Sequence, residues 1–177
     1  MENNVNSSKV YTLYYAFFLI PLMITIFGVM FFFMFKVLTY ETSSPEDYLT
    51  DVQIGSATKR WQAAFELSKL LSNPEMVPTD EGFKNKMVSI YEHSIHDNPM
   101  VRTYMALAMG RTGQQEYGPI LMEGMNDEDM ESRLAAIKAL GLLGYAPAVN
   151  GIQKFTSENF SNAERLAATI ALGNIGE

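Results

Sequence analysis

A short phrase that begins with Arg and ends with Gly occurs three times in the second half of the chain. Its copies are residues 102–113 (RTYMALAMGRTG), 133–144 (RLAAIKALGLLG) and 165–176 (RLAATIALGNIG). The three arginines are 31 and 32 residues apart. A repeat of this period is typical of a solenoid, whose units bury their apolar faces only against their neighbours and which usually provides a binding surface. The chain is therefore expected to fold as a stack of similar units.

The residues of the phrase have physical reasons to recur. Alanines between the Arg and the first Gly allow helices of adjacent units to approach closely, while Leu and Met fill the seam between them. The final Gly favours the left-handed conformation that closes a helix. The Arg lies on the first turn, where it is expected to bridge to an acid of the neighbouring repeat or to contact the end of the preceding helix.

Each unit is predicted to contain two helices joined by a turn. A divergent first copy starts at Arg60, within a helix predicted over 57–71, and second helices are predicted over 81–95, 117–125 and 146–155. The last unit, from Asn162, has only its first helix. We therefore predict about three and a half repeats over 57–177, preceded by a linker and a short capping helix over 39–56.

A long apolar segment precedes the repeats. Residues 10–35 contain no charged side chain, and as a helix they would reach about 39 Å, more than the ~30 Å hydrocarbon core of a bilayer. We predict a polar tail over 1–9 and a transmembrane helix over 10–38. Lys9 and Lys36 flank the segment almost symmetrically, so its orientation is weakly encoded, with a slight preference for an amino terminus in the cytoplasm.

Two other interpretations of this segment are weaker. The apolar part of a cleaved signal peptide is normally shorter and ends in a small-residue site, which is missing after Phe35. A buried core helix would need a partner, and the separate polar repeat domain offers little for it to pack against. We therefore expect a single-pass protein, of the bacterial inner membrane, in contact with the lipid bilayer.

Charge and cysteine content narrow the possible partners. The formal net charge is −7, whereas nucleic-acid binding requires a basic surface. The chain has no Cys, which excludes disulfides and thiolate zinc sites but does not distinguish reducing from oxidising compartments. We therefore predict no nucleic-acid partner.

The repeated phrase resembles HEAT repeats, in the short form found in bilin-lyase-type HEAT proteins, with the pattern D-x-x-x-x-R-x-x-A-A-x-A-L-G-x-x-G. Residues 97–113 match it except at Tyr104 and Met105, residues 128–144 match with Lys138 in the apolar face, and residues 165–176 match closely. The resemblance covers about 57–177 and implies an all-α solenoid behind the transmembrane helix. It says little about activity, because such arrays serve as scaffolds, adaptors and occasionally enzymes.

Two motifs and one resemblance raise the possibility of chemistry. His93 and His96 are neighbours on a helix and, with Glu92, could face one metal ion. HEAT-type iron hydroxylases resemble this chain in fold but rely on repeated His-Glu pairs, and no such pair occurs here. Residues 126–131 (NDEDME) lack the alternating pattern of a calcium loop and are better explained as a capped acidic first turn. The bilin-lyase resemblance also suggests a pigment-attachment enzyme, which a membrane anchor and a short array disfavour.

The sequence therefore favours a non-enzymatic role without catalytic, cofactor or metal sites. We predict a membrane-anchored scaffold, adaptor or accessory subunit whose partners are subunits of a membrane complex. The candidate protein-binding residues lie on the last helix and on the first full helix: Leu166, Ile170, Leu172, Ile175 and Trp61. The alternative is a small HEAT-type metal- or ligand-binding enzyme, lyase-like or hydroxylase-like, centred on His93 and His96. A third possibility is that the transmembrane helix itself is the functional element.

Overall fold

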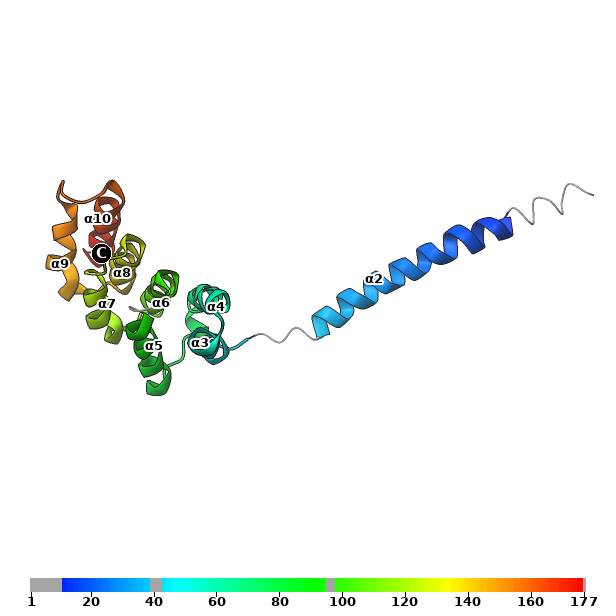
Figure 1. Cartoon of the computed structure of the whole chain (residues 1–177), viewed down its shortest axis with the longest axis horizontal. Helices are drawn as coiled ribbons and strands as arrows, with labels where there is room; N and C mark the ends of the chain where they lie inside the picture. The colour runs from blue at the N-terminus through cyan, green and yellow to red at the C-terminus, as the bar shows by residue number, and fades with distance from the viewer. Residues whose placement is uncertain (1–10, 39–42, 95–97, 177) are drawn as a thin grey trace, which may run out of the picture. The chain divides into compact units, whose positions relative to one another are not determined.

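The structure is a computed structural model that describes residues 11–38, 43–94 and 98–176. The chain divides into two units, Met1–Thr42 and Ser43–Glu177. Every regular element in these described ranges is helical, as Figure 1 shows, so the prediction of an all-α chain is confirmed. The predicted tail over 1–9, Lys9, and the candidate ligand His96 lie outside the described residues.

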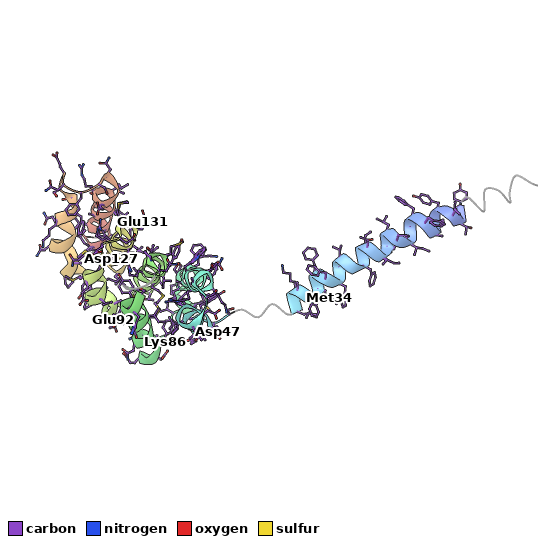
Figure 2. All side chains as sticks on the ribbon, viewed as in Figure 1. Met34, Asp47, Lys86, Glu92, Asp127 and Glu131 are labelled. Atoms are coloured by element: carbon purple, nitrogen blue, oxygen red, sulfur yellow. The ribbon has the colours of Figure 1, made fainter. Side chains whose placement is uncertain are left out.

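The first unit is one apolar helix. It runs over Tyr11–Leu38 and includes a π-helical turn, η1 (Tyr15–Leu19), followed by α2 (Ile20–Leu38). Pro21 lies two residues after this turn and has no N–H to donate to the carbonyl four residues earlier, which explains the local widening. No residue of the helix is buried, and Met34 and its neighbours project freely in Figure 2. By length and composition the helix could cross a bilayer, a property that it shares with signal sequences.

The second unit is a stack of helix pairs. Helices α4, α6, α8 and α10 follow one another in one row, and α3, α5, α7 and α9 lie beside them (Figure 1). The bounds are α3 Pro45–Ile54, α4 Ala57–Leu70, α5 Glu81–His93, α6 Pro99–Arg111, α7 Gly118–Gly124, α8 Met130–Leu143, α9 Val149–Gln153 and α10 Asn162–Gly176. The last helix, which the sequence left without a companion, packs against both α8 and α9.

Side chains and glycines at the helix ends fix where the helices begin and end. Ser44 caps α3 in a capping box with Asp47. Asp129, within the segment 126–131 that was predicted to be a capped acidic first turn, caps α8. Gly113 and Gly144 have φ of 69° and 61°, so two of the three closing glycines adopt the predicted left-handed conformation.

The later second helices are shorter than predicted. Helix α7 is preceded by a 3₁₀ turn, η4 (Gln115–Tyr117), and α9 lies between η5 (Ala146–Ala148) and η6 (Lys154–Thr156). Glycines occur in both segments, and glycine has low helix propensity. Gly124 is nevertheless required, because a Cβ atom there would collide with the Tyr91 hydroxyl of α5.

Close contacts between small residues hold the row together. A Cβ atom on Gly110 of α6 would lie 2.6 Å from the Cα atom of Ala139 in α8. The same distance separates a Cβ atom on Gly141 from the Cα atom of Ala171 in α10. Beside these contacts, buried Met109 and Leu140 occupy the equivalent position of successive repeats. The seam therefore combines small and long residues, as the repeated phrase predicts.

Candidate functional site

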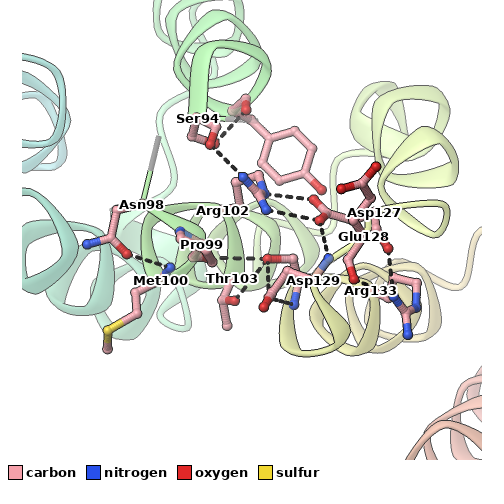
Figure 3. Close-up of polar contacts among 12 residues, drawn as sticks. Ser94, Asn98, Pro99, Met100, Arg102, Thr103, Asp127, Glu128, Asp129 and Arg133 are labelled. Carbon is pink, nitrogen blue, oxygen red and sulfur yellow. Dashed lines mark hydrogen bonds and ion pairs between the residues drawn. The ribbon is translucent and has the colours of Figure 1, made fainter. Parts of the chain in front are cut away.

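The most strongly connected polar group of the array is the Arg of the first complete phrase. Arg102 Nε lies 2.7 Å from Asp127 Oδ2, and its Nη2 donates to Asp127 Oδ1 at 2.9 Å. Its Nη1 donates to the Ser94 carbonyl at 2.8 Å, across the end of α5 (Figure 3). Both side chains of the ion pair are only 7% exposed. Arg102 therefore joins α5, α6 and the loop before α8.

The other arginines of the repeat make related contacts. Arg60 Nε donates to the Val52 carbonyl at 2.7 Å, eight residues earlier, as Arg102 does to Ser94. Arg133 Nη1 donates to the Asp127 carbonyl at 2.7 Å, and its Nη2 donates to Glu164 Oε1 at 2.8 Å. Both predicted contacts, with the preceding helix end and with an acid of the next repeat, are thus present.

Glu164 is the buried acid at the start of α10. Hydrogen bonds from Arg133 and then from Ser161 lower the pKa of its carboxyl from the ordinary value of 4.5. Because the pKa of the Glu164 carboxyl is lower in the folded chain than in the unfolded chain, the ionised carboxylate stabilises the fold at pH values above the unfolded pKa. This stabilisation is lost as the pH falls through the folded-state pKa.

Replacing Glu164 with Gln is expected to lower the free energy of unfolding at neutral pH by about 1 kcal/mol, since Arg133 is partly exposed and solvent weakens the pair. The variant should also lose less additional stability than the wild type below pH 4.5. Chemical denaturation across a pH series measures both effects. Exposed Glu158, changed to Gln, controls for loss of charge, and equal acid sensitivity of the wild type and Glu164→Gln would contradict the assignment.

A hollow of about 360 Å³ lies beside the Arg102–Asp127 pair. We call it the acidic pocket, and its lining residues are Tyr91, Arg102, Ile120, Glu123, Gly124, Asn126, Asp127 and Glu128. The arginine is already paired with Asp127, so the charge it contributes is neutralised. Glu123 and Glu128 form no ion pair with any residue in the described ranges. The pocket therefore has a net negative charge.

The hydroxyl of Tyr91 also belongs to this pocket. Tyr91 is 1% exposed, and its hydroxyl forms no hydrogen bond within the part of the chain that the structure describes. Burial, and then the charge of Asp127, raises the pKa of Tyr91 to about 12, so the phenol is neutral. A neutral phenol can both donate and accept a hydrogen bond. Such an unpartnered group beside a hollow is suited to binding a polar ligand.

The predicted metal residues lie elsewhere. His93 ends α5, and its Nδ1 lies 2.7 Å from the Ser89 carbonyl, so Nδ1 donates this hydrogen bond and Nε2 is the ring nitrogen left for another partner. It lines a separate hollow of about 190 Å³ together with Arg60. His96 lies outside the described residues. Among the residues that are described, no group of three His, Asp or Glu side chains could hold a metal ion.

The residues predicted to bind a partner fall into two groups. Leu166 and Ile170 are exposed on α10, whereas Leu172 and Ile175 are partly buried against the core. Trp61 lies in an aromatic cluster within the array. Its ring stacks on Tyr104 of α6 at 6.5 Å, and Tyr104 also meets Phe65 at 5.1 Å.

The acidic pocket was not predicted from the sequence. Asp127 was assigned to a capped helix turn, whereas in the structure it is the partner of Arg102. Tyr91 and Glu123 lie in different second helices and stand in no recognisable motif. The sequence feature connected with them is Gly124, which is needed because a Cβ atom there would collide with the Tyr91 hydroxyl. That need becomes visible only once the position of the hydroxyl is known.

Two comparisons with known proteins bear on this site. The family model for HEAT repeats matches residues 86–173. Over 118 residues, or 66% of its length, the chain is 29% identical to a deoxyhypusine hydroxylase of Schizosaccharomyces pombe. The match covers 35% of that enzyme, so the chain spans about a third of its relative.

This similarity corrects two predictions. The relative is an enzyme, which overturns the expectation of a non-enzymatic scaffold, adaptor or accessory subunit. It also overturns the expectation that the chain is not an enzyme, and favours the alternative of a small hydroxylase-like protein. Scaffolds and enzymes of this architecture share the same repeated phrase, which forms the seam between helices, so the phrase could not distinguish them.

Proposed function

We propose that this chain, whose residues 86–173 match the family model for HEAT repeats, is a small hydroxylase-like enzyme with its substrate site in the acidic pocket. The observation that carries the proposal is the similarity to deoxyhypusine hydroxylase over 66% of the chain. The pocket supports it, because it combines unpaired carboxylates with a buried hydroxyl that lacks a partner.

The lining favours a primary ammonium group on an aliphatic stem. An ammonium has three donors and no acceptor, and it meets acceptors at Glu123, Glu128 and the Tyr91 hydroxyl. Ile120 and the Tyr91 ring provide an apolar wall for the stem. A bare metal ion would leave most of a 360 Å³ hollow unfilled. The substrate class is therefore an aliphatic amine, free or as part of a larger molecule.

The chain's histidines do not fit the iron centre of HEAT-type hydroxylases. That centre uses repeated His-Glu pairs, whereas this sequence has two His and no such pair. We therefore derive no step through iron. The second candidate is a metal- or ligand-binding enzyme centred on His93 and His96, and the hydrogen bond of His93 Nδ1 favours it because it leaves Nε2 as the nitrogen for a ligand.

Metal analysis of the purified chain separates the two candidates. A stoichiometric metal that is lost when both His93 and His96 are changed to Ala supports the second candidate. If the metal content of the wild type and the double variant is the same, the second candidate fails and the pocket proposal is unaffected.

The enzymatic proposal is tested in cells that naturally make the chain. Mass spectrometry compares cells with the gene deleted and cells that carry either the wild type or the Glu123→Gln, Glu128→Gln double variant. We expect one amine-bearing molecule to gain an oxygen atom only with the wild type: a C–H bond becomes C–OH with O2 as the oxidant, and the second oxygen atom leaves as water with two electrons and two protons from a cellular reductant. Glu131→Gln, an exposed acid of α8 outside the pocket, is the matched control. The proposal fails if no gain of oxygen depends on the chain.

Replacing Tyr91 with Phe is expected to weaken binding of butylamine about tenfold, since it removes one hydrogen bond to a charged group. Tyr117→Phe is the matched control, because its hydroxyl is also buried without a partner but lies outside the pocket. Titration followed by nuclear magnetic resonance measures both variants, with butanol as the uncharged probe. Equal butylamine affinity in the two variants would remove Tyr91 from the site.

We also propose that Tyr11–Leu38 anchors the enzyme as a single pass through a bacterial inner membrane, with the amino terminus in the cytoplasm. Its apolar length and full exposure support an anchor. Since the chain has no Cys, a single Cys at Glu158 is a clean reporter of topology. An impermeant maleimide should label Glu158→Cys in intact spheroplasts. Labelling only after lysis would reverse the orientation, and release of the chain by alkaline carbonate would exclude the anchor.

A further inference from the structure

Three aromatic side chains of the first two repeats form a patch at the surface of the array. We call it the aromatic patch and define it by Trp61 and Phe65 of α4 and Tyr104 of α6. The Trp61 and Tyr104 rings stack at 6.5 Å, and the Phe65 ring meets the Tyr104 ring edge-on at 5.1 Å. Phe65 is 37% exposed, and the other two are partly buried against the core. The patch therefore presents apolar surface while its rings hold one another in place.

The repeat itself does not require these rings. Tyr104 stands two residues after the Arg of its phrase, where the two later copies have Ala135 and Ala167. Both alanines are buried, so a methyl group is enough to complete the seam at this position. Phe65 stands at a position that exposed Lys138 occupies two repeats later. The aromatic character of the patch is thus a property of these two repeats and not of the fold.

The polar ends of the rings meet solvent. In the described ranges the Trp61 indole N–H and the Tyr104 hydroxyl form no hydrogen bond, and neither belongs to the polar atoms that are buried without a partner. Each of these two side chains therefore combines a packed apolar body with a hydrated polar end. Trp and Tyr are enriched between the hydrocarbon and the headgroups of a bilayer because both ends find a suitable environment there.

The distribution of charge allows this end of the array to approach a bilayer. Residues 43–72, which include α3 and α4, contain four acidic and three basic side chains, whereas residues 73–177 contain 14 acidic and eight basic ones. The negative charge is thus concentrated in the later repeats, which an anionic lipid surface would repel.

A lysine stands beside the patch. Lys69 Nζ lies 5.3 Å from the centre of the Phe65 ring. Its ion pair with Glu66 is exposed on both sides and is therefore weak. The long stem of Lys69 lets its ammonium reach a lipid phosphate while the neighbouring rings stay deeper.

The proposed membrane anchor keeps the patch near a bilayer. Pro45, the first residue of α3, follows Leu38, the last residue of α2, by seven residues. A chain of seven residues spans at most about 25 Å. Helix α4 packs against α3 and begins three residues after α3 ends. With α2 in the membrane, the first helices of the array are held close to the headgroups, which raises the effective concentration of the patch at the lipid surface.

We propose that the aromatic patch binds the headgroup region of the membrane that α2 crosses, with its three rings at the edge of the hydrocarbon and Lys69 against a lipid phosphate. This inference rests on the proposed anchor and is independent of the proposed amine site. The contact gives the array a fixed orientation toward the bilayer, which a tether by itself does not.

The single Trp of the chain reports this contact directly. The full chain is reconstituted into vesicles of phosphatidylcholine with a minor share of phosphatidylglycerol, with or without phosphatidylcholine brominated near the headgroup end of its acyl chains. Bromine quenches Trp fluorescence only in close contact, and we expect the brominated vesicles to quench Trp61. In the matched control, Trp61→Phe with Leu166→Trp, the single Trp lies exposed on α10 and should not be quenched. Absence of quenching at Trp61, or equal quenching at both positions, would overturn the proposal.

Two further measurements separate the parts of this proposal. Lys69→Glu should reduce the quenching of Trp61, because it replaces attraction to lipid phosphate by repulsion, whereas Lys154→Glu, at an exposed lysine of η6, should not. Equal quenching in these two variants would remove Lys69 from the contact. Flotation of the vesicles in alkaline carbonate tests the anchor. A chain that floats without quenching overturns the aromatic contact alone, and a chain that does not float overturns the anchor and this inference with it.

Discussion

Replacing Arg102 with Leu is expected to lower the free energy of unfolding by about 3–5 kcal/mol, the usual cost of breaking a buried ion pair from one side. Asp127 would stay buried with its negative charge, and the Ser94 carbonyl would lose its donor. Chemical denaturation of the full chain in detergent, followed by the fluorescence of the single Trp, measures the loss. The contact between α5 and α6 should open first, and with it one wall of the acidic pocket.

Arg165→Leu is the matched control for this prediction. Arg165 holds the same position of the phrase but is exposed, so its replacement should change stability by about 0.5 kcal/mol or less. The double variant Arg102→Leu, Asp127→Leu should recover part of the loss, since it removes the uncompensated charge. If Arg102→Leu were no more harmful than Arg165→Leu, the ion pair would not hold the array together.

Replacing Gly141 with Ala is expected to destabilise the array by about 2 kcal/mol, whereas Gly173→Ala should stabilise it by about 0.5–1 kcal/mol. At Gly141 the new Cβ atom would lie 2.6 Å from the Cα atom of Ala171, and a backbone atom cannot move aside as a flexible side chain can. At Gly173 the new atom meets open space, so only the gain in helix propensity remains.

Gly110→Ala provides an internal check on this difference in sign. It repeats the Gly141 substitution against Ala139 and should cause a similar loss. All three variants are compared by the same denaturation measurement. Losses of similar size at Gly110, Gly141 and Gly173 would mean that the position is sensitive in itself and that the facing helix is not the cause.

The repeated phrase was sufficient to predict the helical row and the role of its arginines. The spacing of Arg and Gly in it follows from local geometry, because a helix turn places a residue at a known angle and height. The contacts of Arg102 with Ser94 and of Arg133 with Glu164 were therefore expected in kind. The identity of Asp127 as the partner of Arg102 was not expected. Asp127 lies in an irregular loop, where the number of residues along the chain does not fix the direction of a side chain.

The second helices were predicted less well. A single helix over 146–155 was expected, but the structure divides this segment into η5, α9 and η6. Apolar periodicity does not distinguish an α-helix from a series of short turns that bury the same side chains. Where Gly weakens the helix, packing against the first helices decides the local geometry.

By itself the sequence determined the apolar amino-terminal segment, the all-α repeat and the close approach of neighbouring first helices at their alanines, since each depends on the order of residues along one or two helices. Only the tertiary structure decided that Tyr91, Glu123 and Glu128 share one pocket, and that Gly173 has no facing Ala. The physical reason is that a site is defined by the distances between atoms of different helices. These distances follow from how the helices pack, and the spacing of residues along the chain does not contain them.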